Sequence, residues 1–106
     1  MKALRLLPLF GVLVACGGSA VPEPTSADAT RAGAHFSDVT LSELSHGRTL
    51  YVSRCGSCHA LRRPGELAPE QWQTELDEMR TKNGVKLSDP EARAIYRYLV
   101  IAGSAG

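Results

Sequence analysis

The five residues Cys55-Gly56-Ser57-Cys58-His59 form a C-x-x-C-H motif near the middle of a 106-residue chain. Two thiols at this spacing can reach the two vinyl groups on one edge of a porphyrin and form thioether bonds with them. The imidazole beside the second thiol then lies under the iron as an axial ligand. The motif therefore predicts one covalently bound haem c, attached through Cys55 and Cys58 and ligated by His59.

Other chemistry also uses such cysteines. A thioredoxin-like dithiol contains C-x-x-C within a βαβ pattern, which the flanking residues here lack. A zinc site would use Cys55 and Cys58 with two histidines, but the sequence has no second C-x-x-C and no H-x-x-x-H pair. A structural disulfide between Cys55 and Cys58 leaves His59 unexplained. Haem attachment is the preferred interpretation, and a thiol–disulfide redox protein that uses Cys55 and Cys58 is the alternative.

Helix start and stop patterns lie on both sides of the motif. Thr40-Leu41-Ser42-Glu43 and Ser88-Asp89-Pro90-Glu91 are capping boxes, and Pro69 suits the first turn of a helix. Asn83-Gly84 is a typical stop. No segment alternates with a period of two over the length of a strand. We therefore predict an all-α domain of three short helices, over residues 40–54, 69–83 and 88–103.

Apolar residues recur at helical spacing in these segments. Trp72, Leu76 and Met79 stand at i, i+4 and i+7 in the second helix. Aromatic residues make up only 6% of the chain, which is little bulk for the core of a small domain. A covalent haem would supply a large apolar plate for packing. The expected faces of the other two helices are Leu44, Gly47 and Tyr51, and Ile95, Tyr96, Leu99, Val100 and Ala102.

The start of the chain has the features of an export signal. A short cationic region precedes an apolar run from Leu6 to Val14, which is too short for the ~20 residues of a membrane-spanning helix. The next residues, Leu13-Val14-Ala15-Cys16, resemble the lipobox of bacterial lipoproteins. This resemblance implies cleavage before Cys16 and lipidation of its sulfur and amino terminus. Residues 1–15 are therefore predicted to be a signal peptide.

The composition changes between the lipobox and the first predicted helix. Gly, Ser, Ala, Pro and Thr dominate from Gly17 to about Asp38, and no apolar period is visible. We predict a lipidated flexible tether over 16–38 and a folded domain over 39–106. The lipid would attach the protein to a membrane of the cell envelope, facing the periplasm. Gly17, in place of an aspartate after Cys16, favours the outer membrane.

The predicted domain resembles the small monohaem class I cytochromes c over about 41–101. Gly47-Arg48-x-Leu50-Tyr51-x-x-x-Cys55-x-x-Cys58-His59-Ala60 matches the first-helix pattern of that family, and Ile95-x-x-Tyr98-Leu99 matches its last helix. The resemblance implies a compact three-helix fold around a covalently bound haem. It also implies that the aromatic residue of the last helix packs near Gly47, where a larger side chain would hold the two helices apart.

The sixth iron ligand is predicted to be Met79. It is the only methionine left after removal of the signal peptide, and electron-transfer cytochromes pair a thioether with histidine. Trp72 and Met79 also resemble the pattern Pro-x-x-Trp … Met-Arg of compact bacterial cytochromes c, which places Trp72 in the haem environment. The alternatives are His46, His35 or an open sixth position, with Met79 acting only as a core residue.

Residues after the motif have expected roles near the haem. Pro64 resembles in position the proline at which a backbone carbonyl accepts a hydrogen bond from the free ring N–H of the ligand histidine in many cytochromes c. A simple turn at Pro64 is the alternative. Arg62 and Arg63 are expected to be solvated, and their alternative partners are the haem propionates or an acidic protein.

These observations predict a single-electron carrier rather than an enzyme. Its partners would be redox proteins of the cell envelope. The formal charge of +1 and the absence of a basic stripe argue against a nucleic-acid partner. The alternative function is a haem enzyme subunit or a small-ligand sensor, in which Met79 does not bind iron and the sixth position is open.

Overall fold

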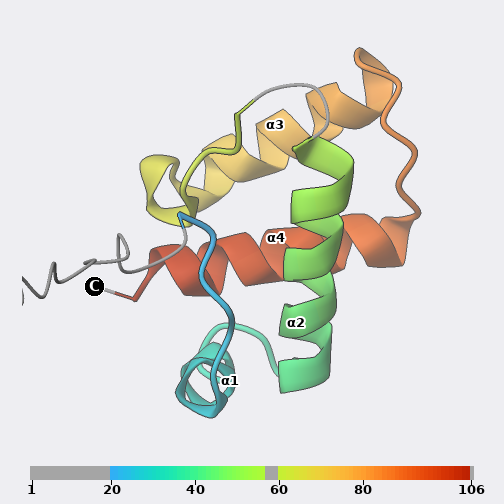
Figure 1. The fold of residues 1–106 in the computed structure, drawn as a ribbon. Helices are drawn as coiled ribbons and strands as arrows, with labels where there is room; N and C mark the ends of the chain where they lie inside the picture. Colours follow the sequence, from blue (N-terminus) through green and yellow to red (C-terminus); the bar gives the residue numbers. More distant parts are fainter. Residues whose placement is uncertain (1–19, 57–59, 106) are drawn as a thin grey trace, which may run out of the picture.

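The computed structural model describes residues 20–56 and 60–105. The elements are α1 (Ser26–Ala32), α2 (Leu41–Leu50), the π-helix η1 (Tyr51–Cys55), the 3-10 helix η2 (Pro64–Glu66), α3 (Pro69–Thr81) and α4 (Asp89–Gly103). No strand occurs in the described ranges, so the predicted all-α class is confirmed. Figure 1 shows α2 crossing α4, with α3 on one side of α4 and α1 on the other. Within this part of the chain, no helix is long and apolar enough to cross a membrane.

The α2 helix begins at the predicted cap. The Thr40 side chain accepts a hydrogen bond from the Glu43 backbone N–H at 3.1 Å. The Glu43 carboxylate, expected to reach back to Thr40, instead accepts from Arg97 Nη1 of α4 at 2.9 Å. A guanidinium on the neighbouring helix thus takes the carboxylate away from the cap. The helical run continues through η1 and ends at Cys55, one residue after the predicted end at Arg54.

The crossing of α2 and α4 depends on Gly47. A Cβ atom at this position would overlap the backbone carbonyl of Ala94 and lie 3.0 Å from Tyr98 Cβ. Only glycine lets the two backbones approach so closely. Tyr98 is buried at the same crossing, so the expected packing of the last-helix aromatic residue near Gly47 is confirmed.

The α3 helix presents the predicted apolar stripe to the core. Trp72, Leu76 and Met79 are all buried. The helix ends at Thr81, and Gly84 follows with a φ of 67°, a left-handed conformation that favours glycine.

The α4 helix starts with the capping box that its sequence predicts. The Glu91 N–H donates to the Ser88 hydroxyl at 3.2 Å, and the Ser88 N–H donates to the Glu91 carboxylate at 2.9 Å. The buried face of α4 is displaced around the helix from the predicted one, because α2, α3 and α1 all pack on it. Of the predicted face, Tyr96, Val100 and Ala102 are only partly buried. The buried residues of α4 are Ala94, Ile95, Tyr98, Leu99 and Ile101.

The segment before α2 differs from the flexible coil expected over 16–38. Residues 26–32 form α1, and the capping box that begins it joins Thr25 and Asp28 at 2.7 and 3.2 Å. A helix this short depends on tertiary packing. That packing comes from a second apolar cluster, in which Ala32, Leu44 and Ile101 are buried and Ala29, Phe36 and Val39 pack around them. The predicted signal peptide and Cys16 lie outside the described residues.

Residues 21–38, which we call the N-terminal strap, are also hydrogen-bonded to the helices beneath them. The Tyr98 hydroxyl donates to the Pro22 carbonyl at 2.6 Å, and Arg48 Nε donates to the Val21 carbonyl at 3.0 Å. Farther along, Arg31 Nη2 donates to the Ile101 carbonyl at 3.0 Å. The packed part of the chain therefore extends back at least to Val21, whereas the sequence predicted a domain from residue 39.

Candidate haem site

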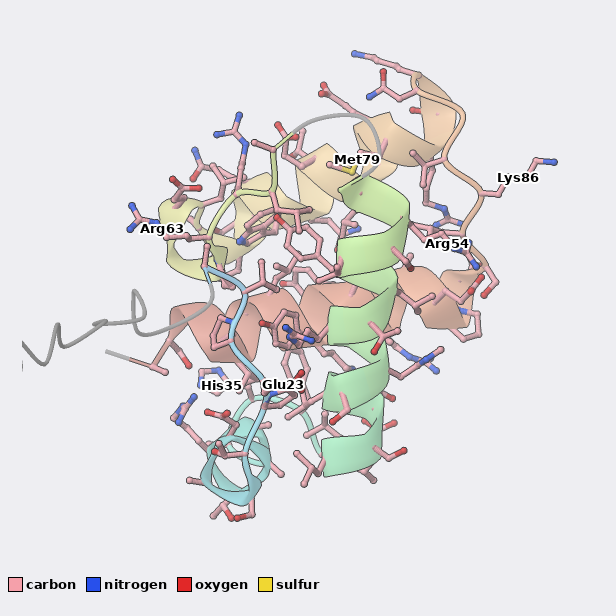
Figure 2. All side chains as sticks on the ribbon, in the orientation of Figure 1. Glu23, His35, Arg54, Arg63, Met79 and Lys86 are labelled. Carbon is pink, nitrogen blue, oxygen red and sulfur yellow. The ribbon has the colours of Figure 1, made fainter. Side chains whose placement is uncertain are left out.

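The end of η1 places a cysteine of the motif opposite the predicted iron ligand. Cys55 and Met79 are both buried, at 2% and 7% exposure. Cys55 Sγ lies 3.7 Å from Met79 Sδ, although 24 positions separate the two residues in the chain. Figure 2 labels Met79 beside the end of the helical run formed by α2 and η1. The fold thus brings the candidate attachment sulfur and the candidate thioether ligand into contact in the core. Residues 57–59, with Cys58 and His59, lie outside the described residues.

Two aromatic rings form a wall next to this sulfur pair. The Tyr51 and Trp72 rings meet edge to face, with centroids 5.8 Å apart and planes at 86°. Both rings are buried, and each polar atom finds a backbone acceptor in the segment after the motif. The Tyr51 hydroxyl donates to the Arg62 carbonyl at 2.7 Å, and Trp72 Nε1 donates to the Pro64 carbonyl at 2.8 Å. These bonds hold residues 60–67 between η1 and α3.

The hydroxyl of Tyr51 keeps its proton throughout the physiological range. Burial raises the pKa of Tyr51 well above its ordinary value, and the nearby thiol of Cys55 raises it further. Tyr51 therefore acts as a neutral hydrogen-bond donor to the loop, and it places no charge beside the sulfur pair.

Pro64 and Trp72, both predicted to lie near the haem, contact each other. Pro64 is buried and begins η2, and its carbonyl accepts the Trp72 indole bond. The expected bond from the His59 ring to a carbonyl near Pro64 involves a residue outside the described ranges and stays a prediction. The bond between Trp72 and Pro64 does not follow from any motif in the sequence. A buried indole N–H needs an acceptor, so the presence of Trp72 in an apolar stripe was the available indication.

The alternative histidine ligands lie away from the sulfur pair. His46 is exposed on α2 and lines a shallow groove with Glu43 and Pro90. His35 is exposed on the strap, where it lines a hollow with Pro64 and the end of α4. In Figure 2, His35 and Met79 lie on opposite sides of α4. The geometry therefore favours Met79 over His46 and His35.

Charged residues surround the pocket, mostly in ion pairs. Arg62 and Arg63 are exposed, as expected, and Arg63 Nε lies 3.9 Å from Glu66. A groove of about 950 Å³ is lined by Arg54 and Arg80. These two arginines are the sequence neighbours of Cys55 and Met79. The groove residues are Arg54, Asp77, Arg80, Thr81, Gly84, Val85, Lys86, Leu87, Ser88 and Glu91.

The described residues fit a haem c. The donor set of thiol and thioether sulfurs suits covalent attachment and axial ligation of a haem iron. The apolar side chains around Cys55 and Met79 suit the porphyrin plate, and they form one contiguous cluster with them. The members of this cluster include Leu50, Tyr51, Trp72, Leu76, Val85 and Leu87.

Comparison with known proteins agrees with this chemistry. Residues 51–105, more than half of the chain, match the family model of the dihaem cytochromes c. No curated protein and no solved structure matches the chain. The matched region contains the C-x-x-C-H motif, η2, α3 and α4, so it includes both the predicted attachment residues and Met79. The chain belongs to the dihaem cytochrome c family, whose chemistry is electron transfer through covalently bound haem.

Proposed function

We propose that the protein is a single-electron carrier with one haem c, axial ligands His59 and Met79, and a lipid anchor at Cys16. The observation that supports the ligand assignment best is the 3.7 Å contact between Met79 Sδ and Cys55 Sγ in the buried core. Among the described residues, Met79 is the axial donor that stands beside an attachment sulfur. A buried thioether would also raise the reduction potential relative to a second histidine.

Cys55 and Cys58 would hold the haem covalently, and His59 and Met79 would ligate its iron. The haem supplies an iron that accepts and releases one electron. The protein contributes a dry and rigid surrounding. Tyr51 and Trp72 exclude water from one side, and their hydrogen bonds fix the segment that follows the motif. Rigid surroundings reduce the rearrangement that accompanies each electron transfer.

We propose one haem per chain, although the family is named for two. The sequence contains a single C-x-x-C-H motif, and the third cysteine, Cys16, stands alone in the lipobox. The intact mass of the purified holoprotein tests this number. We expect the mass of the polypeptide plus one haem, and a mass with two haems would contradict the proposal.

Spectra of the holoprotein test the ligand assignment. A carrier with His59 and Met79 shows low-spin iron and a weak near-infrared band from sulfur-to-iron charge transfer, and it binds CO slowly. High-spin iron that binds CO rapidly would favour a haem enzyme subunit or a sensor. A thiol–disulfide protein would contain no covalent haem at all, and the all-α fold gives this alternative no support, because such dithiols lie in a βαβ pattern.

The anchor at Cys16 would hold the domain close to a membrane of the cell envelope, facing the periplasm. The strap packs on the domain from Val21 onward, so only a short stretch separates Cys16 from the folded unit. Five residues span at most about 18 Å. The domain would therefore stay near membrane-bound redox partners. The outer membrane is favoured, because Gly17 follows Cys16 in place of an aspartate.

Replacing Cys16 with Ser tests the anchor. Each buried CH₂ contributes ~0.8 kcal/mol, so three acyl chains would make detachment negligible in the native protein. We expect native protein in the membrane fraction and Cys16→Ser protein in the soluble fraction or blocked as a precursor. Native protein in the soluble fraction with an unmodified Cys16 thiol would contradict the proposal.

A further inference from the structure

Arg54 connects the helical run that contains Cys55 to two later parts of the chain. Its Nη1 donates to the Lys86 carbonyl at 2.6 Å, and its Nη2 lies 3.4 Å from the Glu91 carboxylate. Lys86 belongs to the loop between α3 and α4, and Glu91 lies in the first turn of α4. Figure 2 shows Arg54 and Lys86 at the same side of the molecule, near the start of α4. The Arg54 guanidinium therefore joins η1, the loop between α3 and α4, and the start of α4, next to the candidate haem site.

The loop that Arg54 contacts is bonded directly to Met79. The Val85 backbone N–H donates to the Met79 carbonyl at 3.0 Å, and the next residue, Lys86, gives its carbonyl to Arg54. The side chain of Leu87 is buried just beyond, which holds the same stretch against the core. Two consecutive loop residues thus connect the backbone of Met79 to the neighbour of Cys55.

We propose that Arg54 is a positioning residue that keeps Met79 at its ligating position, an inference that rests on the ligand assignment of the proposed function. The end of α3 has no covalent link to the haem, whereas Cys55 would have one. A hydrogen bond from a charged guanidinium to a carbonyl is stronger than one between neutral groups. By fixing the Lys86 carbonyl to the helical run that contains Cys55, Arg54 opposes the movement of Met79 away from the iron.

Added imidazole measures this movement. Imidazole binds ferric iron at the sixth position only when Met79 has left it, so its apparent Kd is inversely proportional to the fraction of open molecules. Arg54→Gln keeps a side chain of similar polarity but removes the charge and the paired donors. We expect the apparent Kd for imidazole to fall about fivefold, which is the effect of one half-exposed charged hydrogen bond.

Two matched variants control for general effects. Arg31→Gln removes a similar bond, from Arg31 Nη2 to the Ile101 carbonyl at 3.0 Å, in the strap on the other side of α4. Glu91→Gln removes the charge that faces Arg54 but keeps the side-chain oxygen that accepts from Ser88. We expect both variants to bind imidazole within twofold of the wild type. Arg54→Lys, with one compact donor, should lower the apparent Kd by more than twofold but by less than Arg54→Gln does.

Each outcome decides between the proposals. A fivefold fall restricted to the Arg54 variants supports the positioning role. An Arg54→Gln protein within twofold of the wild type overturns it, and so does an equal fall in Arg31→Gln, which would indicate general destabilisation. An equal fall of the apparent Kd in Glu91→Gln would mean that Arg54 acts through Glu91, and it would overturn the role of the bond to the Lys86 carbonyl. If Arg54→Gln fails to fold, Arg54→Lys gives the decision by the same twofold limit. A wild-type protein without the sulfur-to-iron band overturns the ligand assignment itself, and the role of Arg54 with it.

Discussion

Two apolar clusters lie on opposite sides of α4, and they differ in what completes them. The first cluster contains Cys55, Met79 and the edge-to-face pair of Tyr51 and Trp72. The second joins Ala32 of the strap to α2 and α4, and its other buried members are Leu44 and Ile101. The first cluster includes sulfur atoms suited to bind a haem, whereas the second consists entirely of ordinary apolar side chains.

The two clusters are also held differently at their edges. Around the second cluster, Arg97 lies 5.1 Å from the centre of the Phe36 ring and pairs with Asp38 and Glu43 at 2.9 Å. Around the first, hydrogen bonds from buried rings hold the loop after the motif. The strap side is thus held by an ion-pair network, and the sulfur side would gain its largest packing partner with the haem. Changes at the two sulfur residues of the first cluster should therefore affect spectra and stability, and changes in the second cluster should affect stability alone.

The largest expected effect comes from the two motif cysteines. In the double variant Cys55→Ser, Cys58→Ser, no thioether can form, so we expect the haem to separate from the polypeptide on a denaturing gel. Haem staining of the gel, beside an antibody that detects the polypeptide, measures the loss. The Cys16→Ser protein is the control, because it lacks a cysteine that the motif does not use. Covalent haem in the double variant would mean that Cys55 and Cys58 are not the attachment residues.

The next largest effect is expected at Met79. Met79→Ala should remove the sulfur-to-iron band and lower the reduction potential, because the thioether favours ferrous iron. It should also destabilise the fold by about 2–5 kcal/mol, because it leaves a cavity in the first cluster. Near-infrared spectroscopy and redox titration measure the first two changes, and denaturant unfolding measures the third.

Leu76→Ala is the matched control for Met79→Ala. Leu76 is buried one turn earlier on the same face of α3, so its removal should cost similar stability and leave the band in place. A Met79→Ala protein that keeps the wild-type band would show that Met79 is only a core residue.

The difference between the two clusters also explains what the sequence could predict. The stripe of Trp72, Leu76 and Met79 follows from spacing alone, and the need for Gly47 follows from the family resemblance. The strap could not be found in the same way, since α1 is too short to show a period and its apolar partners lie far away in the chain. Leu44 and Ile101 are such partners, and they bury Ala32 only after α2 and α4 have crossed.

Within the candidate site, the separate roles were predictable but their connections were not. The motif chemistry indicated Cys55, and the family pattern indicated Met79 and Trp72. The contact of the two sulfurs, the bond from Trp72 to Pro64 and the bond from Arg54 to the loop join residues that are distant in sequence. Such pairings depend on tertiary geometry, which a single sequence does not encode in any local pattern.

A moderate effect is expected at Gly47, where the helices beneath both clusters cross. In Gly47→Ala the new Cβ would overlap the Ala94 carbonyl, a backbone atom that cannot move without shifting α4. Alanine gains ~1 kcal/mol in helix propensity, and overpacking costs about 1–3 kcal/mol or more, so we expect a net loss of stability. Denaturant unfolding measures it. Gly65→Ala is the control, because its Cβ would lie 3.7 Å from the Gly103 carbonyl, an ordinary contact. Equal stability of the two variants would contradict the close crossing.

The smallest effect is expected at Tyr98. It measures what one hydrogen bond to the strap contributes to stability. Tyr98→Phe removes the hydrogen bond to the Pro22 carbonyl but keeps the ring at the crossing, so the loss at neutral pH should be about 1 kcal/mol. Because the bond joins α4 to the strap and involves no predicted haem ligand or attachment residue, the near-infrared band and the reduction potential should not change. Urea unfolding at pH 7, with spectra of the same samples, measures both.

The pH dependence of stability tests the same bond from a second direction. Burial raises the pKa of Tyr98 from 10.0 to about 12. The folded state therefore holds this proton more tightly than the unfolded state, so the stability from Tyr98 is complete below pH 10 and is lost between about pH 10 and 12. Tyr98→Phe should make this loss of stability with pH smaller. The loss that remains would come from Tyr51, because burial raises the pKa of that tyrosine as well. A Tyr98→Phe protein with the full wild-type decline would show that the strap is not held by a buried phenol.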